Sequence, residues 1–220
     1  MTDSAAKAPA NALAASERDA LADLMQEVGP DAPTLCGTWT TRDLAAHLVV
    51  RATRPDAAAG LVIPPLAGYL EKVQDAVARR EWTSLVTDVR QGPPRWSPQS
   101  LAALDGATNT IEYFVHHEDV RRASEPWEPR QLASTDVAML WEQAARGSGF
   151  LLRRSPVGVT FAPTDGPAAG TRREVRKGER QVVLTGPVGE IVLATYGRVT
   201  KGLEIGGADA DVAAFLNFGR

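Results

Sequence analysis

The chain has 220 residues, of which 44% are hydrophobic and 23% are charged, and its formal net charge is −3. These proportions are typical of globular proteins with a buried core, and the mildly acidic balance gives no basic field of the kind that attracts nucleic acid or anionic membranes. We therefore expect neither nucleic acid nor membrane as a partner. The single cysteine, Cys36, excludes an internal disulfide and any site built from several thiolates.

The sequence also lacks the features of a secreted or membrane-spanning chain. No stretch approaches the roughly 18 apolar residues that a membrane span requires. Residues 1–15 are rich in alanine but do not show a basic segment followed by a long apolar run. A single cysteine suits a reducing compartment, so a cytoplasmic location is expected.

The first two-thirds of the chain is predicted to be helical, with connections suited to a bundle. Apolar residues recur at helical spacing, and the intervening segments carry Gly and Pro. Thr40 is a candidate N-cap, because Asp43 follows three residues later and places a carboxylate in the first turn. Helices are predicted at about 10–28, 40–54, 66–79, 82–89, 100–123 and 134–152.

After Pro156 the pattern changes to short β-branched runs between Gly and Pro turns. Strands are predicted at 157–161, 172–177, 181–185 and 202–207, and helices at 186–198 and 209–218. The fold class is therefore α+β. We place a helical bundle in residues 1–153 and a small α+β domain in residues 154–220.

The helix predicted over 100–123 contains two adjacent histidines among carboxylates. At 100° per residue, His116 lies about 40° from Glu112, and Asp105 and Asp119 lie within about 20° of Glu112. These residues form one polar stripe. His117 points about 140° away from Glu112, so His116 is the candidate for function.

Two ordinary explanations compete with a functional one. A Glu-x-x-x-His pair is common on exposed helices, and His47 can be a core histidine with a hydrogen-bonding partner. Taken together, however, His47, Glu112 and His116 suggest a facial set of two imidazoles and one carboxylate. Such a set binds a divalent transition metal and leaves one coordination position open. Asp43 and Asp119 are candidates to orient the two histidines.

Two motifs carry a resemblance to a known family. The segments "GTWTTRDLAAHLV" (37–49) and "TIEYFVHHEDVRRA" (110–123) resemble the mycothiol-dependent maleylpyruvate isomerase family, within the DinB-like group of metal-binding four-helix bundles. The segment "VVLTGPVGEIVLATYGR" (182–198) looks like the sterol-carrier-like C-terminal module of that family. The doubled histidine fits an actinobacterial metal-binding branch of the group better than the isomerases themselves.

The resemblance implies a divalent metal, with zinc as the expected ion, held by His47, Glu112 and His116. It implies mycothiol as a thiol cosubstrate, a small-molecule electrophile as substrate, and Arg198 as a catalytic residue. The function expected is a thiol-activating transferase or isomerase. The alternative is a non-catalytic metal-binding protein that sequesters a small ligand or a partner.

Two further sets of residues lie near the predicted ligands in the sequence. A thiolate at Cys36 would be a good fourth ligand, but a small buried hydrophobe is the simpler role. Arg121 and Arg122 lie one turn beyond the ligand helix positions, and we expect both to be solvated.

Overall fold

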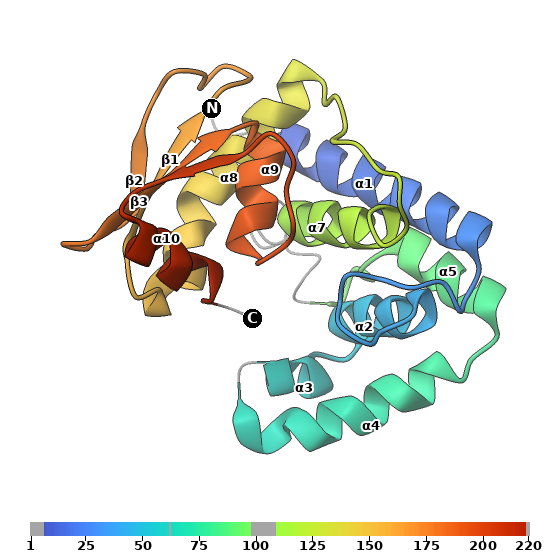
Figure 1. Cartoon of the computed structure of the whole chain (residues 1–220). Coiled ribbons are helices and arrows are strands. Elements are labelled where there is room, and N and C mark those ends of the chain that lie inside the picture. Colours follow the sequence, from blue (N-terminus) through green and yellow to red (C-terminus); the bar gives the residue numbers. More distant parts are fainter. Residues whose placement is uncertain (1–6, 62, 98–108, 219–220) are drawn as a thin grey trace, which may run out of the picture. The chain divides into compact units, whose positions relative to one another are not determined.

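The computed structural model describes residues 7–61, 63–97 and 109–218, and the chain divides into two compact units, Met1–Trp127 and Glu128–Arg220. The described part of the first unit is helical, and the second combines helices with a four-stranded sheet (Figure 1). The predicted α+β class is confirmed. Of the helix predicted over 100–123, residues 100–108 lie outside the described residues.

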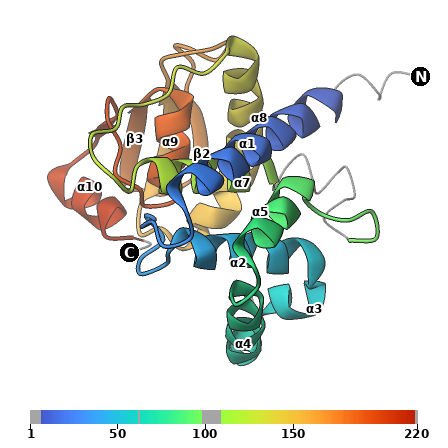
Figure 2. The same cartoon turned by 90° about the vertical axis from the view of Figure 1, so that its right-hand side faces the viewer.

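Four helices of the first unit enclose one core. They contribute buried apolar side chains such as Leu21, Leu44, Leu85 and Tyr113. The first and last of these helices lie side by side (Figures 1 and 2). The four are α1 (Lys7–Val28), α2 (Thr41–Thr53), α5 (Trp82–Gln91) and α7 (Thr110–Arg121).

A second layer of shorter helices covers α2. The longest is α4 (Ala67–Ala78), which packs on α2 and presents Val73 to a small apolar cluster with Val50 and Ala57. Between α2 and α4 the chain forms three short turns that the sequence did not predict as helix. They are α3 (Pro55–Ala58), η1 (Ala59–Leu61) and η2 (Pro64–Leu66).

Helix α2 begins where the sequence predicts. Thr40 is its N-cap, and both halves of a capping box are present. The Asp43 carboxylate accepts hydrogen bonds from the Thr40 backbone N–H at 2.9 Å and from its hydroxyl at 2.8 Å. Caps of this kind stabilise a helix by about 1 kcal/mol. Asp43 therefore fixes the start of the helix that carries His47, one turn further on.

The second unit is built on a sheet of order β2-β1-β3-β4, in which β1 and β3 are parallel and the other pairs antiparallel. Alternate residues of β3, Val182 and Leu184, are buried, as expected for a strand with one face on the core. The elements in chain order are α8 (Ser134–Leu151), η5 (Leu152–Arg154), β1 (Gly158–Pro163), β2 (Arg173–Arg176), β3 (Gln181–Gly186), α9 (Val188–Thr195), β4 (Glu204–Gly206) and α10 (Asp209–Leu216).

Helix α8 groups with the sheet, because it packs on α9 and on β2. The boundary predicted at 153/154 instead lies where the chain changes from helix to strand. The short helix η5, which follows α8, ends at Arg154, and β1 starts at Gly158. Among the described residues, no helix is long and apolar enough to cross a membrane.

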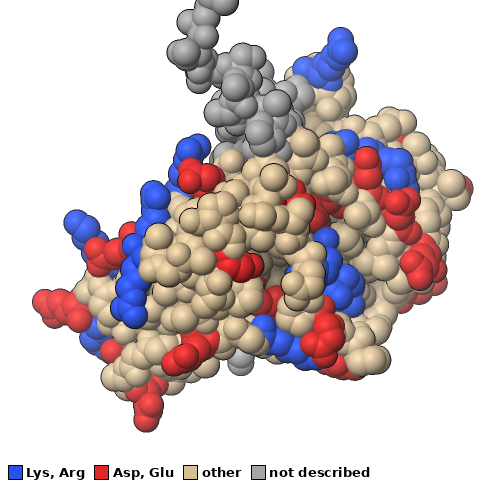
Figure 3. Space-filling view, turned by 90° about the horizontal axis from the view of Figure 1, so that it is seen from above, with Lys and Arg blue, Asp and Glu red and all other residues tan. Residues whose placement is uncertain are grey.

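Acidic and basic side chains lie side by side across the face drawn in Figure 3. Several ionisable groups of the first unit are instead buried. They include Glu17, His47, His117 and Asp119, each with less than one-tenth of its surface exposed.

Candidate metal centre

Three predicted ligand residues come together in the first unit. His47 projects from α2, and Glu112 and His116 project from α7, one helical turn apart. Glu112 Oε1 lies 3.3 Å from His47 Nε2 and 3.3 Å from His116 Nε2. One ligand atom from each residue falls within 4.8 Å of the other two. The side chains thus converge from two helices on one point.

The spacing of these atoms suits a small divalent cation. Zinc binds imidazole nitrogen and carboxylate oxygen at about 2.0–2.2 Å, which places neighbouring ligands of a tetrahedron about 3.4 Å apart. The two nitrogen-to-oxygen distances of 3.3 Å agree with that separation. Two histidines and one carboxylate are also a ligand set that leaves a fourth position for a small molecule. The residues therefore fit the metal that the sequence predicts.

The surroundings hold the two histidine rings in place. His47 is only 7% exposed, and its ring centre lies 5.2 Å from that of Trp39. The rings of His47 and His116 meet edge to face, with their centres 5.5 Å apart. Trp39 also lines a groove of about 460 Å³ with residues of α4, among them Leu70, Glu71 and Gln74.

A positive charge lies beside the three predicted ligand residues. Arg51, one turn after His47 on α2, places Nε 3.4 Å from Glu112 Oε1, the oxygen that both histidines approach. Its Nη1 donates a hydrogen bond of 2.7 Å to the side-chain oxygen of buried Asn109. The i, i+4 spacing of His47 and Arg51 brings both to one face of α2. That spacing was visible in the sequence, but the prediction did not use it.

These contacts shift two pKa values in the metal-free protein. Burial on its own raises the pKa of Glu112, but hydrogen bonds from His116 and His47 and the charge of Arg51 outweigh it, so this pKa lies well below its ordinary value. Burial lowers the pKa of His116, but its hydrogen bonds with Asp119, Cys36 and Glu112 raise it well above the ordinary value. Without metal, a proton on His116 takes the place of the cation beside Glu112.

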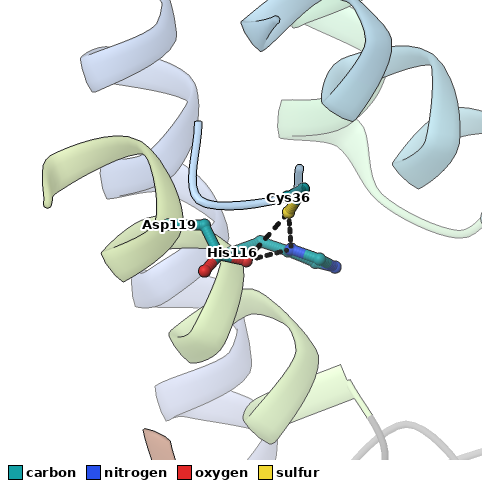
Figure 4. A group of neighbouring side chains, drawn as sticks. All are labelled: Cys36, His116 and Asp119. Carbon is teal, nitrogen blue, oxygen red and sulfur yellow. Dashed lines mark hydrogen bonds and ion pairs between the residues drawn. The ribbon is translucent and has the colours of Figure 1, made fainter. Parts of the chain in front are cut away.

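The other nitrogen of His116 faces a second group (Figure 4). Nδ1 lies 3.0 Å from Asp119 Oδ2, which confirms that Asp119 orients this ring. A neutral ring that donates Nδ1–H to Asp119 presents its Nε2 lone pair to the candidate metal position. The Cys36 thiol also donates to Asp119 Oδ2, at 3.0 Å, and its sulfur lies 3.7 Å from His116 Nδ1. Cys36 is thus on the opposite side of the ring from Glu112.

His117 points in another direction, as the helical arithmetic predicts. Its Nδ1 lies 2.9 Å from Glu17 Oε2 on α1, and both side chains are buried. This ring ties α7 to α1 and contributes no atom to the His47 group. Asp105, the first residue of the predicted polar stripe, lies outside the described residues.

The expectation that Arg121 and Arg122 are both solvated is wrong for Arg122. Its side chain is buried, forms an ion pair with fully buried Glu118, and stacks over the ring of Trp127 with its guanidinium carbon 4.5 Å from the ring centre. The segment after α7 folds back and brings Trp127 to this face. Arg121 also pairs with Glu118, at 2.9 Å, but stays partly exposed.

Comparison with known proteins gives a result for the fold. No protein-family model and no curated protein sequence matches the chain. Two solved structures match, those of mycothiol-dependent maleylpyruvate isomerase and of a histidine-to-alanine mutant of it, with TM-scores of 0.59 and 0.61. Each match has 16% sequence identity, covers 90% of this chain, and covers 91% or 92% of the other. The chain has the fold of this isomerase.

The resemblance seen in the sequence motifs is thereby confirmed at the level of the isomerase fold.

Arg198, the predicted catalytic residue, belongs to the second unit. It follows α9, donates a hydrogen bond of 2.7 Å to the Tyr196 carbonyl, and lines a pocket of about 240 Å³ together with Val199 and Phe215. A role for Arg198 in chemistry remains a prediction.

The two adjacent histidines provide a matched pair for testing the site. His116→Ala removes a predicted ligand. Loss of a residue that only orients a ligand typically weakens metal binding 10- to 100-fold, and we expect His116→Ala to weaken zinc binding more than that. His117→Ala is expected to retain zinc but to lower the free energy of unfolding, because buried Glu17 loses a partner. Zinc content after dialysis and urea unfolding of both variants measure the two effects. Equal loss of zinc in both would contradict the assigned roles.

The raised pKa of His116 predicts how zinc affinity depends on pH. A protonated ring cannot bind metal, so zinc must displace this proton at any pH below the pKa. In that range the zinc affinity falls about tenfold for each pH unit. The decline should therefore begin above the ordinary histidine value of about 6.5. Asp119→Asn removes one cause of the raised pKa and should move the start of the decline to lower pH. Titration against a zinc indicator at several pH values measures this, and affinity constant from about pH 6 to 8 would contradict it.

Proposed function

We propose that the protein binds a divalent metal, with zinc as the resident ion, at His47, Glu112 and His116, and uses it to activate a small-molecule thiol. The observation that carries this proposal is the approach of two imidazole nitrogens to one carboxylate oxygen at 3.3 Å. The support for a thiol comes from the fold, which the chain shares with an isomerase described as mycothiol-dependent.

Each residue has a defined part in this proposal. The two Nε2 atoms and the Glu112 carboxylate hold the cation and leave one position for the thiol. When bound, the metal lowers the pKa of the thiol, so that the reactive thiolate is present at neutral pH. Asp119 fixes the tautomer of His116, and Arg51 gives the site a positive neighbour that suits an anionic electrophile. Mycothiol is the proposed thiol, and transfer to or isomerisation of the electrophile is the proposed reaction.

The size and the lining of a groove also support a small-molecule ligand. The groove beside Trp39, at about 460 Å³, lies in the size range of ligand pockets. Its lining combines an aromatic ring with hydrogen-bonding side chains such as Gln74 and Glu71, which suits the polar remainder of a thiol cosubstrate. From the resemblance of the sequence to the isomerase family, Arg198 is proposed as a catalytic residue.

Cobalt substitution tests thiol binding directly. The Cys36→Ser variant, loaded with Co²⁺, is titrated with mycothiol and with 2-mercaptoethanol, and we expect a sulfur-to-cobalt charge-transfer band to grow with each. Ethylene glycol, the oxygen analogue of 2-mercaptoethanol, serves as the matched control and should give no such band. The serine variant is needed because the protein's own thiol lies close to His116.

An unchanged cobalt spectrum would favour the alternative function. A cobalt spectrum that neither thiol changes would contradict thiol activation while leaving the metal site intact. The chain would then be a non-catalytic metal-binding protein that sequesters a small ligand or a partner.

A further inference from the structure

The His116 ring is shared by two groups of potential ligands. Its Nε2 faces His47 and Glu112, and its Nδ1 faces Cys36 and Asp119. The second group has a sulfur atom, a nitrogen atom and a carboxylate oxygen within 4.8 Å of one another. Figure 4 shows the three side chains of this group pointing toward a common centre.

We propose that Cys36, His116 and Asp119 form a second cation position, selective for a thiophilic metal ion such as Cd²⁺ or Cu⁺. This position differs from the proposed thiol-activating site in two of its three ligands and does not depend on that function. Because the two positions share one imidazole, we further propose that they are occupied alternatively.

The geometry is close to that of a metal site. Zinc–sulfur and zinc–nitrogen bonds of about 2.3 and 2.0–2.1 Å place tetrahedral ligands about 3.6 Å apart. The Cys36 Sγ to His116 Nδ1 distance is 3.7 Å. The two distances to Asp119 Oδ2 are both 3.0 Å, as hydrogen bonds require. An opening of about 0.5 Å would therefore convert these hydrogen bonds into metal bonds.

The backbone holds Cys36 in this position. The loop between α1 and α2 is tied to α7, because the Leu35 N–H donates to the Asp119 carbonyl at 3.0 Å. Within the loop, the Thr34 hydroxyl accepts from the Cys36 N–H at 3.1 Å and donates to the Trp39 carbonyl at 2.8 Å. Cys36 is partly exposed, whereas Asp119 is fully buried. A cation can therefore approach from the side of the thiol.

The ligand types and charges determine which cation this position prefers. Thiolate and imidazole favour soft ions such as Cu⁺, and a site that contains sulfur binds Cd²⁺ better than one that does not. A Cys36 thiolate and the Asp119 carboxylate together supply two negative charges. The His47 group has one carboxylate, and Arg51 lies 3.4 Å from it. Soft cations should therefore prefer the Cys36 side of the ring.

Proton balance accounts for the alternative occupancy. Binding on the Cys36 side releases the thiol proton to solvent and requires Nδ1 without its proton. The one proton of a neutral ring is then on Nε2, which can donate a hydrogen bond to Glu112 Oε1, 3.3 Å away. The Nε2 lone pair is then no longer available to a cation held by His47 and Glu112.

Cadmium alone serves as the probe. Wild-type protein and His47→Ala are expected to bind one Cd²⁺ with a thiolate-to-cadmium charge-transfer band in the ultraviolet, and Cys36→Ser should show no such band. Asp119→Asn, which keeps the thiol, should bind Cd²⁺ at least about tenfold more weakly than wild type. Glu112→Gln replaces His47→Ala if the latter fails to fold. Absence of the band in wild type, or equal affinity in wild type and Asp119→Asn, would overturn the proposed site.

Zinc release tests the alternative occupancy. Cd²⁺ added to zinc-loaded wild-type protein should release one zinc ion for each charge-transfer site formed, as read by a zinc indicator. Formation of the band with zinc retained would overturn this part of the proposal. The thiol titration of cobalt protein uses Cys36→Ser, in which the second position is absent. Failure of thiol activation is therefore distinguishable from failure of the cadmium site.

Discussion

The partly buried carboxylate of Glu112 is the group on which the site depends. A charged carboxylate away from water is costly unless it is paired, and here one oxygen is approached by His47, His116 and Arg51 at 3.3–3.4 Å. Three positive or proton-donating groups around one oxygen bring α2 and α7 to the same point. A divalent cation between the histidines and Glu112 would satisfy the same electrostatic requirement with stronger bonds.

Helix α7 organises the surrounding charges by using its different faces. His116 faces His47 on α2, and His117 faces Glu17 on α1. Glu118 pairs with Arg122 beneath Trp127. Each of these charged groups has its partner in another helix, in a loop or one helical turn away. The orientation of the His116 ring is thus fixed from both ends, by Glu112 on one nitrogen and by Asp119 on the other.

Periodic features of the sequence predicted the fold class and the faces of α7 on which its polar residues lie. The 3.6-residue repeat placed Glu112 and His116 on one face and His117 on another, and the pair Thr40 and Asp43 located the start of α2. The Pro156 change of pattern located the sheet. These features are local, so helix and strand geometry alone determines them.

Contacts between distant segments were not accessible in the same way. Cys36 meets Asp119 across 83 residues, and Glu17 meets His117 across 100, and no spacing rule relates such positions. The burial of Arg122 depends on the loop that carries Trp127. The grouping of α8 with the sheet depends on packing against α9 and β2. Such features follow from tertiary packing, which the sequence pattern does not specify.

We propose that zinc is held by His47, Glu112 and His116, and a crystal structure of the zinc-loaded protein, with diffraction data collected at the zinc absorption edge, would locate the ion. We expect one anomalous peak about 2.0–2.2 Å from the two Nε2 atoms and from a Glu112 oxygen, with no sulfur ligand. A peak bonded to Cys36 and Asp119 in place of these atoms, or a protein that takes up zinc only elsewhere, would contradict it.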